Sequence, residues 1–260
     1  MPVYWDEGQM RVDGAIPSVL AIGDSWFWYP FPGGSLVSQL GKLTDPKGHV
    51  TLAKGMNGAE AYDYVHGKYQ QSVQQALRLY GSSLSAVLIS GGGNDFAGFN
   101  DLRPLLKANC SSESASKDCF RGGDGGLKDF LDRVDESYRT LIGRIYTRTS
   151  MECKILMHSY DYAIPDGRGV FGAAGWLKPA LVDAAVPTEL HSPCMEFLID
   201  SFHRMLERIA ALDPDHLIVV DSRGVLRKSD WANELHPTGK GFERIAKEAW
   251  KPVLEQLGFA

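Results

Sequence analysis

Residues 18–26 read Ser-Val-Leu-Ala-Ile-Gly-Asp-Ser-Trp, an apolar run that stops at a turn bearing a serine. Four similar runs, short and rich in branched apolar residues, also end in turn residues: 49–53, 85–90, 153–158 and 216–221. None of them alternates cleanly between polar and apolar residues, which is typical of strands buried on both faces of a parallel sheet. The sequence therefore predicts a five-stranded parallel sheet, with Ser25 just beyond the end of the first strand.

Helical patterns lie between and after these runs. Apolar residues recur at helical spacing in five segments, residues 33–43, 59–80, 127–147, 195–212 and 241–257. Strands that alternate with helices indicate an α/β fold in which helices cover both faces of the sheet. The chain is long enough to bury a full core, and no internal repeat or linker divides it. We therefore expect a single domain over residues 1–260.

Two segments do not fit this alternation. Residues 109–126 are rich in serine, glycine and charged residues, and we expect a surface loop there. Residues 160–191 follow the fourth predicted strand and contain several glycines and prolines. Such a long irregular insertion is usually functional, and ligands of open α/β sheets bind beyond the carboxyl ends of the strands. Residues 160–191 are therefore expected to form a lid or a wall of a binding site.

Charge and hydropathy exclude several classes of protein. The formal net charge is -5 and basic residues do not cluster, which disfavours binding to nucleic acid. No run approaches the roughly 18 apolar residues of a membrane-spanning helix. The first residues carry acidic side chains and lack the apolar core of a signal peptide, so a cytoplasmic location is favoured over export. The sequence does not indicate an oligomeric state.

The four cysteines are too few for a disulfide framework, and none has the Cys-x-x-Cys spacing of a zinc or redox site: Cys110, Cys119, Cys153 and Cys194. Cys110 and Cys119 flank the serine-rich segment and can pair in an oxidising compartment. In the cytosol we expect both to be reduced. Cys153 lies in an apolar run and is expected in the core.

Turns that follow the first and third predicted strands carry polar groups, and a histidine lies near the C-terminus. A serine hydroxyl needs an adjacent base and an oxyanion hole to act as a nucleophile. Ser25 is in the first of these turns, and Asn94 follows three glycines that let backbone approach a ligand closely. His236 precedes Pro237, which biases the histidine toward an extended conformation. These residues indicate a nucleophile, a neutral hydrogen-bond donor and a base.

The sequence resembles the SGNH hydrolases, also called GDSL-like lipases and esterases, whose four blocks occur here in order. They are Gly-Asp-Ser at 23–25, the turn glycine Gly58, Gly-x-Asn-Asp at 92–95 and His-Pro at 236–237. Each block is weak evidence alone, but the joint match extends over nearly the whole chain. The resemblance implies a flavodoxin-like, three-layer α/β/α sandwich.

The resemblance also implies hydrolysis of esters through an acyl-enzyme, without a metal ion or other cofactor. Ser25 would be the nucleophile, and His236 would be the general base that takes its proton. The oxyanion would be bound by the backbone N–H groups of Ser25 and Gly58 and by the side-chain amide of Asn94. Gly55 is the alternative to Gly58, which fits the spacing to the following helix better.

One position departs from the family pattern. The family has aspartate three residues before the histidine, where this sequence has Asn233. An asparagine carbonyl can accept a hydrogen bond from the imidazole but carries no full charge, and the opposite orientation of the amide favours the wrong tautomer. The site is then a working variant, a weakened site, or one in which another carboxylate substitutes. Asp230 is the nearest such carboxylate, since Glu234 is expected to point elsewhere. We favour a slow or compensated enzyme.

Aromatic residues are expected to form the walls of the site. One group follows the nucleophile and is interrupted by a proline, and another lies in the long insertion. The hypothesis of substrate contact applies to Trp26, Trp28, Tyr160, Tyr162 and Trp176. Phe27, Tyr29 and Phe31 belong to the same aromatic run.

These aromatic loops suit sugar faces, and no long apolar stripe marks a tunnel for an acyl chain. We therefore expect a small or carbohydrate-linked ester as the substrate. Two alternatives stay open: a lipase or thioesterase, and a weakened domain that binds a ligand or glycan without turnover. Asp24 and Asp95, which adjoin the candidate catalytic residues, are interpreted as carboxylates that stabilise turns.

Overall fold

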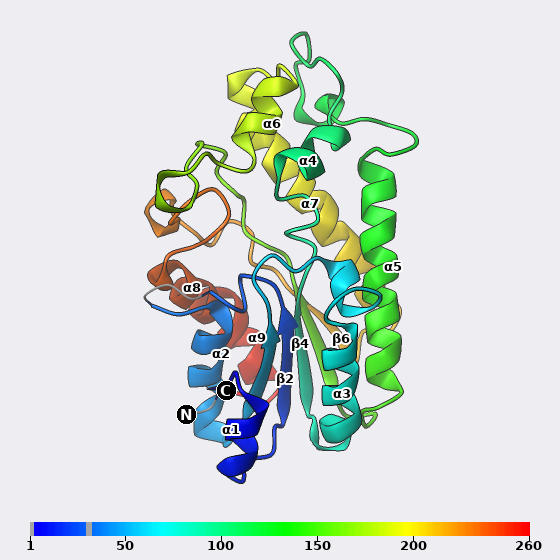
Figure 1. Cartoon of the computed structure of the whole chain (residues 1–260), viewed down its shortest axis with the longest axis vertical. Coiled ribbons are helices and arrows are strands. Elements are labelled where there is room, and N and C mark those ends of the chain that lie inside the picture. The colour runs from blue at the N-terminus through cyan, green and yellow to red at the C-terminus, as the bar shows by residue number, and fades with distance from the viewer. Residues whose placement is uncertain (1–2, 30–32) are drawn as a thin grey trace.

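The computed structural model describes residues 3–29 and 33–260, and six parallel strands form one sheet in this part of the chain (Figure 1). The five predicted strands are present, as β2 (Val19–Gly23), β3 (Thr51–Gly55), β4 (Ala86–Ser90), β5 (Lys154–His158) and β6 (Leu217–Val220). The additional strand, β1 (Val3–Tyr4), pairs with the start of β3 at the edge of the sheet. The predicted number of strands is therefore too small by one, because two residues leave no recognisable apolar run. The order is β1-β3-β2-β4-β5-β6.

Helices cover both faces of the sheet, as the alternating pattern predicted (Figure 1). One face carries α2 (Leu36–Thr44), α8 (Gly239–Ile245) and α9 (Lys251–Gln256), and the other carries α3 (Gln70–Tyr80), α5 (Leu127–Tyr146) and α7 (His191–Ala210). Three shorter helices are α1 (Glu7–Val12), α4 (Phe99–Leu102) and α6 (Lys178–Asp183). No helix in the described part of the chain is long and apolar enough to cross a membrane.

The helix predicted over residues 59–80 is broken. A 3-10 turn at Ala61–Tyr64 is followed by an irregular stretch, and α3 begins only at Gln70. At Gly67 the chain passes so close to Asp63 that a Cβ would lie 2.5 Å from the carboxylate. Periodicity alone cannot reveal this bend, because the apolar residues on either side keep a helical spacing.

The helix predicted over residues 241–257 is also irregular. A π-helical turn at Ala246–Trp250 separates α8 from α9. Pro252 lies in the first turn of α9 and has no N–H to donate to the preceding turn, which accounts for the irregularity.

The register of the sheet brings the ends of three strands level with one another. Gly23, the last residue of β2, lies beside Gly55 of β3 on one side and Ser90 of β4 on the other. Because parallel strands end at the same edge of a sheet, the turns that follow these residues meet there. This register places the first three sequence blocks side by side.

The segment 109–126 is less exposed than we expected. It contains a 3-10 turn at Ser116–Cys119, and the N–H of Cys110 donates to the carbonyl of Ala184 just after α6. All four cysteines of the chain are buried free thiols. The polar residues of the segment therefore lie at the surface, as expected for a loop, whereas its two cysteines pack into the core.

Candidate active site

Ser25 lies in the turn directly after β2, at the carboxyl edge of the sheet. Gly23 lets this turn pack closely, because a Cβ at that position would lie 2.7 Å from the Phe27 ring and 2.8 Å from Cβ of Ser90. The Oγ atom of Ser25 lies 2.8 Å from Nε2 of His236, although the two residues are far apart in the sequence. The fold therefore brings the first and last sequence blocks into hydrogen-bonding contact.

His236 lies in a short loop before α8 that is closed by backbone hydrogen bonds. The N–H of Ala232 donates to the carbonyl of His236 at 2.9 Å, and the N–H of Thr238 donates to the carbonyl of Asp230 at 2.7 Å. Thr238 also caps α8, since its hydroxyl accepts from the N–H of Gly241. The closed loop and the helix cap together hold the imidazole in place.

Asn233 is buried beside His236, and its amide has a defined orientation. Its Oδ1 accepts from the backbone N–H groups of Leu235 and His236, at 3.0 and 2.9 Å, and lies 3.1 Å from Nδ1 of the imidazole. A backbone N–H can only donate, so the side of the amide that faces these groups is the carbonyl. Nδ1 of the imidazole therefore carries the proton, and Nε2 accepts from the Ser25 hydroxyl.

Neither acidic neighbour replaces the missing aspartate. The Asp230 carboxylate accepts from the N–H of Arg227 and forms an ion pair with Arg244, both at 2.9 Å. Glu234 is directed to the long insertion, where its carboxylate accepts from backbone N–H groups. The hypothesis that Asp230 substitutes for the aspartate is therefore not supported, because its carboxylate already serves the loop and α8.

Aromatic rings enclose the imidazole of His236. Tyr29 stacks on it with ring centroids 4.7 Å apart and an angle of 22°, and Trp176 meets it edge-on at 5.9 Å. Burial lowers the pKa of His236 to about 4, so the imidazole is neutral at pH 7 and able to accept a proton.

The three candidate oxyanion donors lie at the ends of β2, β3 and β4. Asn94 borders the same pocket as Ser25, and its amide donates one hydrogen to the carbonyl of Ala59 at 2.9 Å. This bond ties Asn94 to the turn of Gly58, whose φ of 75° favours glycine. No hydrogen bond within residues 3–29 and 33–260 uses the N–H of Ser25 or of Gly58. Gly55 is the last residue of β3, which favours Gly58 as the turn glycine.

The glycines after β4 admit aromatic rings of the protein itself. A Cβ on Gly92, which has a φ of 98°, would lie 2.7 Å from the Phe202 ring. A Cβ on Gly93 would lie 2.8 Å from the Tyr160 ring. These contacts account for glycine at both positions. Gly93 also borders the pocket beside Ser25, so the expectation that these glycines open the backbone to a ligand stays a prediction. They let α7 and the insertion pack against the turn that carries Asn94.

Asp24 and Asp95 both hold turns at the edge of the sheet. Asp24 accepts from the N–H of Trp26 and from the hydroxyls of Ser90 and Tyr160, at 3.0, 3.1 and 2.5 Å. Asp95 accepts from a backbone N–H after β3 at 2.9 Å. Burial raises the pKa of Asp24 to about 6 and that of Asp95 to about 7. These contacts agree with their interpretation as turn-stabilising carboxylates.

Only some of the proposed aromatic walls meet at the site. Trp26 and Tyr160 border the pocket beside Ser25, with ring centroids 5.1 Å apart and nearly perpendicular. Trp28 instead borders a separate hollow next to α3. Phe31 and its neighbouring prolines lie outside the described residues.

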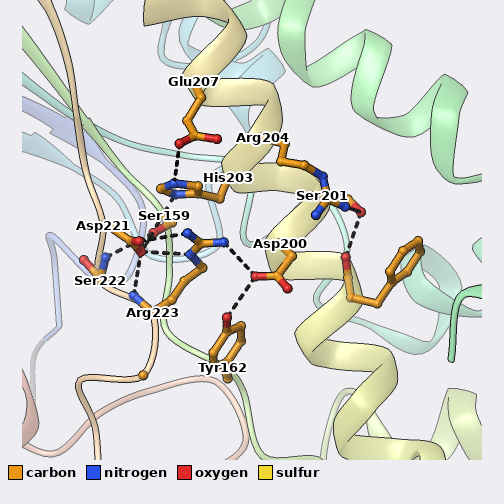
Figure 2. Close-up of polar contacts among 12 residues, drawn as sticks. Ser159, Tyr162, Asp200, Ser201, His203, Arg204, Glu207, Asp221, Ser222 and Arg223 are labelled. Carbon is orange, nitrogen blue, oxygen red and sulfur yellow. Dashed lines mark hydrogen bonds and ion pairs between the residues drawn. The ribbon is translucent and has the colours of Figure 1, made fainter.

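Tyr162 belongs to a polar network away from this pocket (Figure 2). Its hydroxyl donates to Asp200 of α7 at 2.8 Å, and Arg223, which follows β6, binds both Asp200 and Asp221. His203 and Glu207, on the next turns of α7, lie at the other side of the network. Tyr162 is not among the described residues that border the pocket, so substrate contact by this residue gains no support.

The pocket beside Ser25 is small and largely apolar. Its lining includes Ile199 of α7, Ala163 of the insertion and Trp231 of the loop that carries His236, residues 230–238, which we call the histidine loop. None of these three residues belongs to a motif. Its volume is about 30 Å³, which is room for about two water-sized groups. Ile199 could not be found from sequence, because it belongs to the apolar stripe of a helix that is otherwise core. No cluster of metal-binding side chains occurs among the described residues.

The strands and helices match those of solved lipases and esterases. The extracellular lipase of Streptomyces rimosus aligns with a TM-score of 0.55 and 16% identity over 93% of this chain and 99% of that one. A proposed arylesterase from Agrobacterium tumefaciens aligns with a TM-score of 0.55 and 14% identity over 93% and 100% of the two chains. A proposed lipolytic protein of the G-D-S-L family from Desulfitobacterium hafniense aligns with a TM-score of 0.52 and 13% identity over 91% of this chain and 98% of that one.

No protein-family model and no curated protein matches the sequence itself. At these low identities the structural matches establish the fold. The chain has the α/β fold of the SGNH hydrolases, as the resemblance of its sequence blocks implied.

Proposed function

We propose that this protein is a serine-dependent ester hydrolase. The proposal rests on two consecutive contacts, from Ser25 Oγ to His236 Nε2 at 2.8 Å and from His236 Nδ1 to Asn233 Oδ1 at 3.1 Å. A nucleophile, a base and a group that orients the base are the parts that serine catalysis requires. Lipases and esterases among the proteins of the same fold support this class of chemistry.

In the proposed reaction, the Ser25 hydroxyl attacks the carbonyl carbon of the ester while Nε2 of His236 takes the hydroxyl proton. The Oγ–C bond forms, and the oxyanion is bound by the N–H groups of Ser25 and Gly58 and by the Asn94 amide. The intermediate then breaks its bond to the alcohol, which leaves with the proton from His236. Water attacks the acyl-enzyme by the same route and releases the acid and the free serine.

Asn233 supplies the orientation of the imidazole without balancing its charge. Its carbonyl selects the tautomer in which Nε2 accepts the serine proton, and this orientation supports turnover over a disabled site. The imidazolium formed during the reaction has no carboxylate partner at this position. We therefore propose a slow enzyme, in which the burial of His236 adds to the cost of protonation.

The size of the pocket supports a small ester as substrate. The enclosed part of the pocket, about 30 Å³, suits a short acyl group such as acetyl. Trp176 at the imidazole offers an aromatic face on which a sugar ring can pack. We propose short-chain esters of small alcohols or carbohydrates, and regard a lipase or thioesterase as the less favoured alternative.

The proposal is tested with a fluorophosphonate probe and an aryl acetate. We expect the wild type to be labelled at Ser25 and to hydrolyse the acetate, and Ser25→Ala to lose both. Ser222→Ala is the matched control, because the Ser222 hydroxyl is buried but makes no hydrogen bond within the described residues. Full hydrolysis by Ser25→Ala would rule out this nucleophile.

A domain that only binds its ligand is the competing function, and Asn233 is the feature that favours it. If the wild type is neither labelled nor active and Asn233→Asp restores both, the natural protein is a binding domain with a disabled site. Turnover by the wild type rejects that function.

A further inference from the structure

Glu234 is fully buried between the histidine loop and the long insertion. Its carboxylate accepts three hydrogen bonds from backbone N–H groups, those of Gly167 at 2.8 Å, Leu177 at 2.7 Å and Lys178 at 3.2 Å. Its own N–H donates to the carbonyl of Arg168 at 3.1 Å. Three of these four hydrogen bonds join Glu234 to both sides of a hairpin in the insertion, and the one from Lys178 holds the first residue of α6.

The hairpin comprises residues 167–177. Arg168 and Ala174 form an antiparallel bridge, and the N–H of Gly175 donates to the carbonyl of Gly167 at 2.9 Å. Gly175 lies directly against the Glu234 carboxylate, where a Cβ would overlap all three carboxyl atoms. The glycine and the buried carboxylate are therefore complementary in shape.

Trp176 lies between two residues that contact this carboxylate, and its ring meets the imidazole of His236 edge-on at 5.9 Å. The start of the insertion is held elsewhere. Asp161 accepts from the N–H groups of Gly224 and Leu226, and the neighbouring Tyr162 binds α7 in the network of Figure 2. The contacts of Glu234 thus fix the part of the insertion nearest the candidate base.

We propose that Glu234 is a positioning residue, whose carboxylate clamps the hairpin of residues 167–177 to the histidine loop and so holds Trp176 against His236. The insertion is then a fixed wall of the site rather than a lid. This inference rests on the proposed function for its kinetic consequence, whereas the clamp itself can be tested without any measurement of activity.

A carboxylate suits this position because all of its side-chain partners are donors. Both carboxylate oxygens accept, and each meets at least one backbone N–H. Glutamine has the same shape, but its NH2 group would face an N–H and leave a buried donor without a partner. Glu234→Gln is therefore expected to loosen the hairpin while it preserves the volume of the side chain.

The clamp is tested by limited trypsin digestion, in which mass spectrometry follows cleavage between Arg168 and Gly169. We expect cleavage to be at least about 10-fold faster in Glu234→Gln than in the wild type, because the bond is protected by the closed hairpin. Asp230→Asn is the matched control, since Asp230 is another buried carboxylate of the same loop with no contact to the hairpin. Equal protection in Glu234→Gln and the wild type overturns the clamp.

The positioning role is tested by kinetics normalised to the fraction of Ser25 that a fluorophosphonate titrates. We expect Glu234→Gln to lower kcat for an aryl acetate by about 10-fold per titrated site, with KM within about threefold, because the imidazole is less well held. A loss explained wholly by fewer titratable sites means that Glu234 is only structural. The double variant of Trp176→Ala and Glu234→Gln should lose no more kcat per titrated site than the worse of the two single variants. Additive losses of kcat would contradict action through Trp176.

Gly175→Ala is a second variant that leaves the carboxylate in place. Its methyl group would displace the carboxylate, so we expect the same faster cleavage after Arg168. Gly122→Ala is its control, since a Cβ at Gly122 meets nothing. If the wild type hydrolyses no ester, the proposed function fails, and the digestion experiments still decide the clamp.

Discussion

At the scale of single residues, the proposed mechanism has Asn233 separate two tasks that one aspartate combines in Ser-His-Asp sites. The backbone N–H groups of Leu235 and His236 fix its carbonyl toward Nδ1, so the imidazole is oriented. The amide adds no negative charge to stabilise the imidazolium. The large loss that follows an Asp-to-Asn change in a serine protease arises from the wrong tautomer, which these two N–H groups prevent here.

Asn233→Asp is expected to raise kcat for an aryl acetate by about 10- to 100-fold, well below the 10⁴ of the protease case. The gain is limited because only the missing charge is restored. Asn109→Asp is the matched control, since Asn109 is exposed, caps a turn and does not border the pocket. Unchanged or lower activity in Asn233→Asp, with the protein still folded, would contradict this account of the site.

The low pKa of His236 predicts the pH dependence of the reaction. The base acts when it is neutral, so kcat/KM rises as pH increases through the pKa of His236, about 4, and is level at pH 6.5. Asn233→Asp should move this midpoint upward, because a nearby carboxylate favours the charged imidazole. The measurement is a pH–rate profile with circular dichroism at each pH. A wild-type midpoint near 6.5 would exclude the burial effect.

At the scale of elements, the site depends on strand register and on helix α7. The level ends of β2, β3 and β4 place Ser25, Gly58 and Asn94 at one edge. Gly92 and Gly93 then let Phe202 of α7 and Tyr160 of the insertion pack against the turn that carries Asn94. This packing leaves room for only a small pocket.

Ile199 of α7 is predicted to limit the length of the acyl group. Ile199→Ala should increase the ratio of kcat/KM for an aryl butyrate to that for an aryl acetate by about 10-fold or more, because a methylene in an apolar pocket is worth about 1–3 kcal/mol. Ile209→Ala is the control, as Ile209 is equally buried on the same helix but does not border the pocket. An equal change of this ratio in both variants would assign it to general loosening.

At the scale of the whole molecule, three buried ionisable groups and the half-buried Asp95 make stability depend on pH in opposite directions. The folded pKa values of Asp24 and Asp95 are raised to about 6 and 7, so the stability that they contribute is lost as pH rises through those values. Burial lowers the pKa of His158 to about 3 and that of His236 to about 4. Their contribution is present above pH 6.5 and is lost as pH falls.

His158→Phe is expected to reduce the sensitivity of the fold to acid. The His158 ring is fully buried and stacks on Phe27, and neither ring nitrogen has a well-formed hydrogen bond within the described residues. Between pH 7 and pH 4.5, the free energy of unfolding should fall by about 2–3 kcal/mol less in the variant than in the wild type. Urea unfolding at both values measures this effect, and the comparison cancels any packing cost. A difference independent of pH would contradict the prediction.

The strands β2 to β6 and the long helix α5 could be predicted because their signal is local. β2 and β4 are buried on both faces and read as apolar runs, and α5 keeps a regular apolar stripe. β1 and the break near Gly67 could not be predicted. A two-residue strand is defined by its partner, and the break depends on contact with Asp63.

The sequence alone determined the fold class, the candidate nucleophile Ser25 and the candidate base His236, because short motifs and periodicity carry that information. Only the tertiary structure decided which way the Asn233 amide faces, that Glu234 clamps the insertion, and that Ile199 borders the pocket. Each of these depends on a close contact between side chain and backbone across loops or between distant elements. Such contacts follow from packing in three dimensions and leave no periodic trace along the chain.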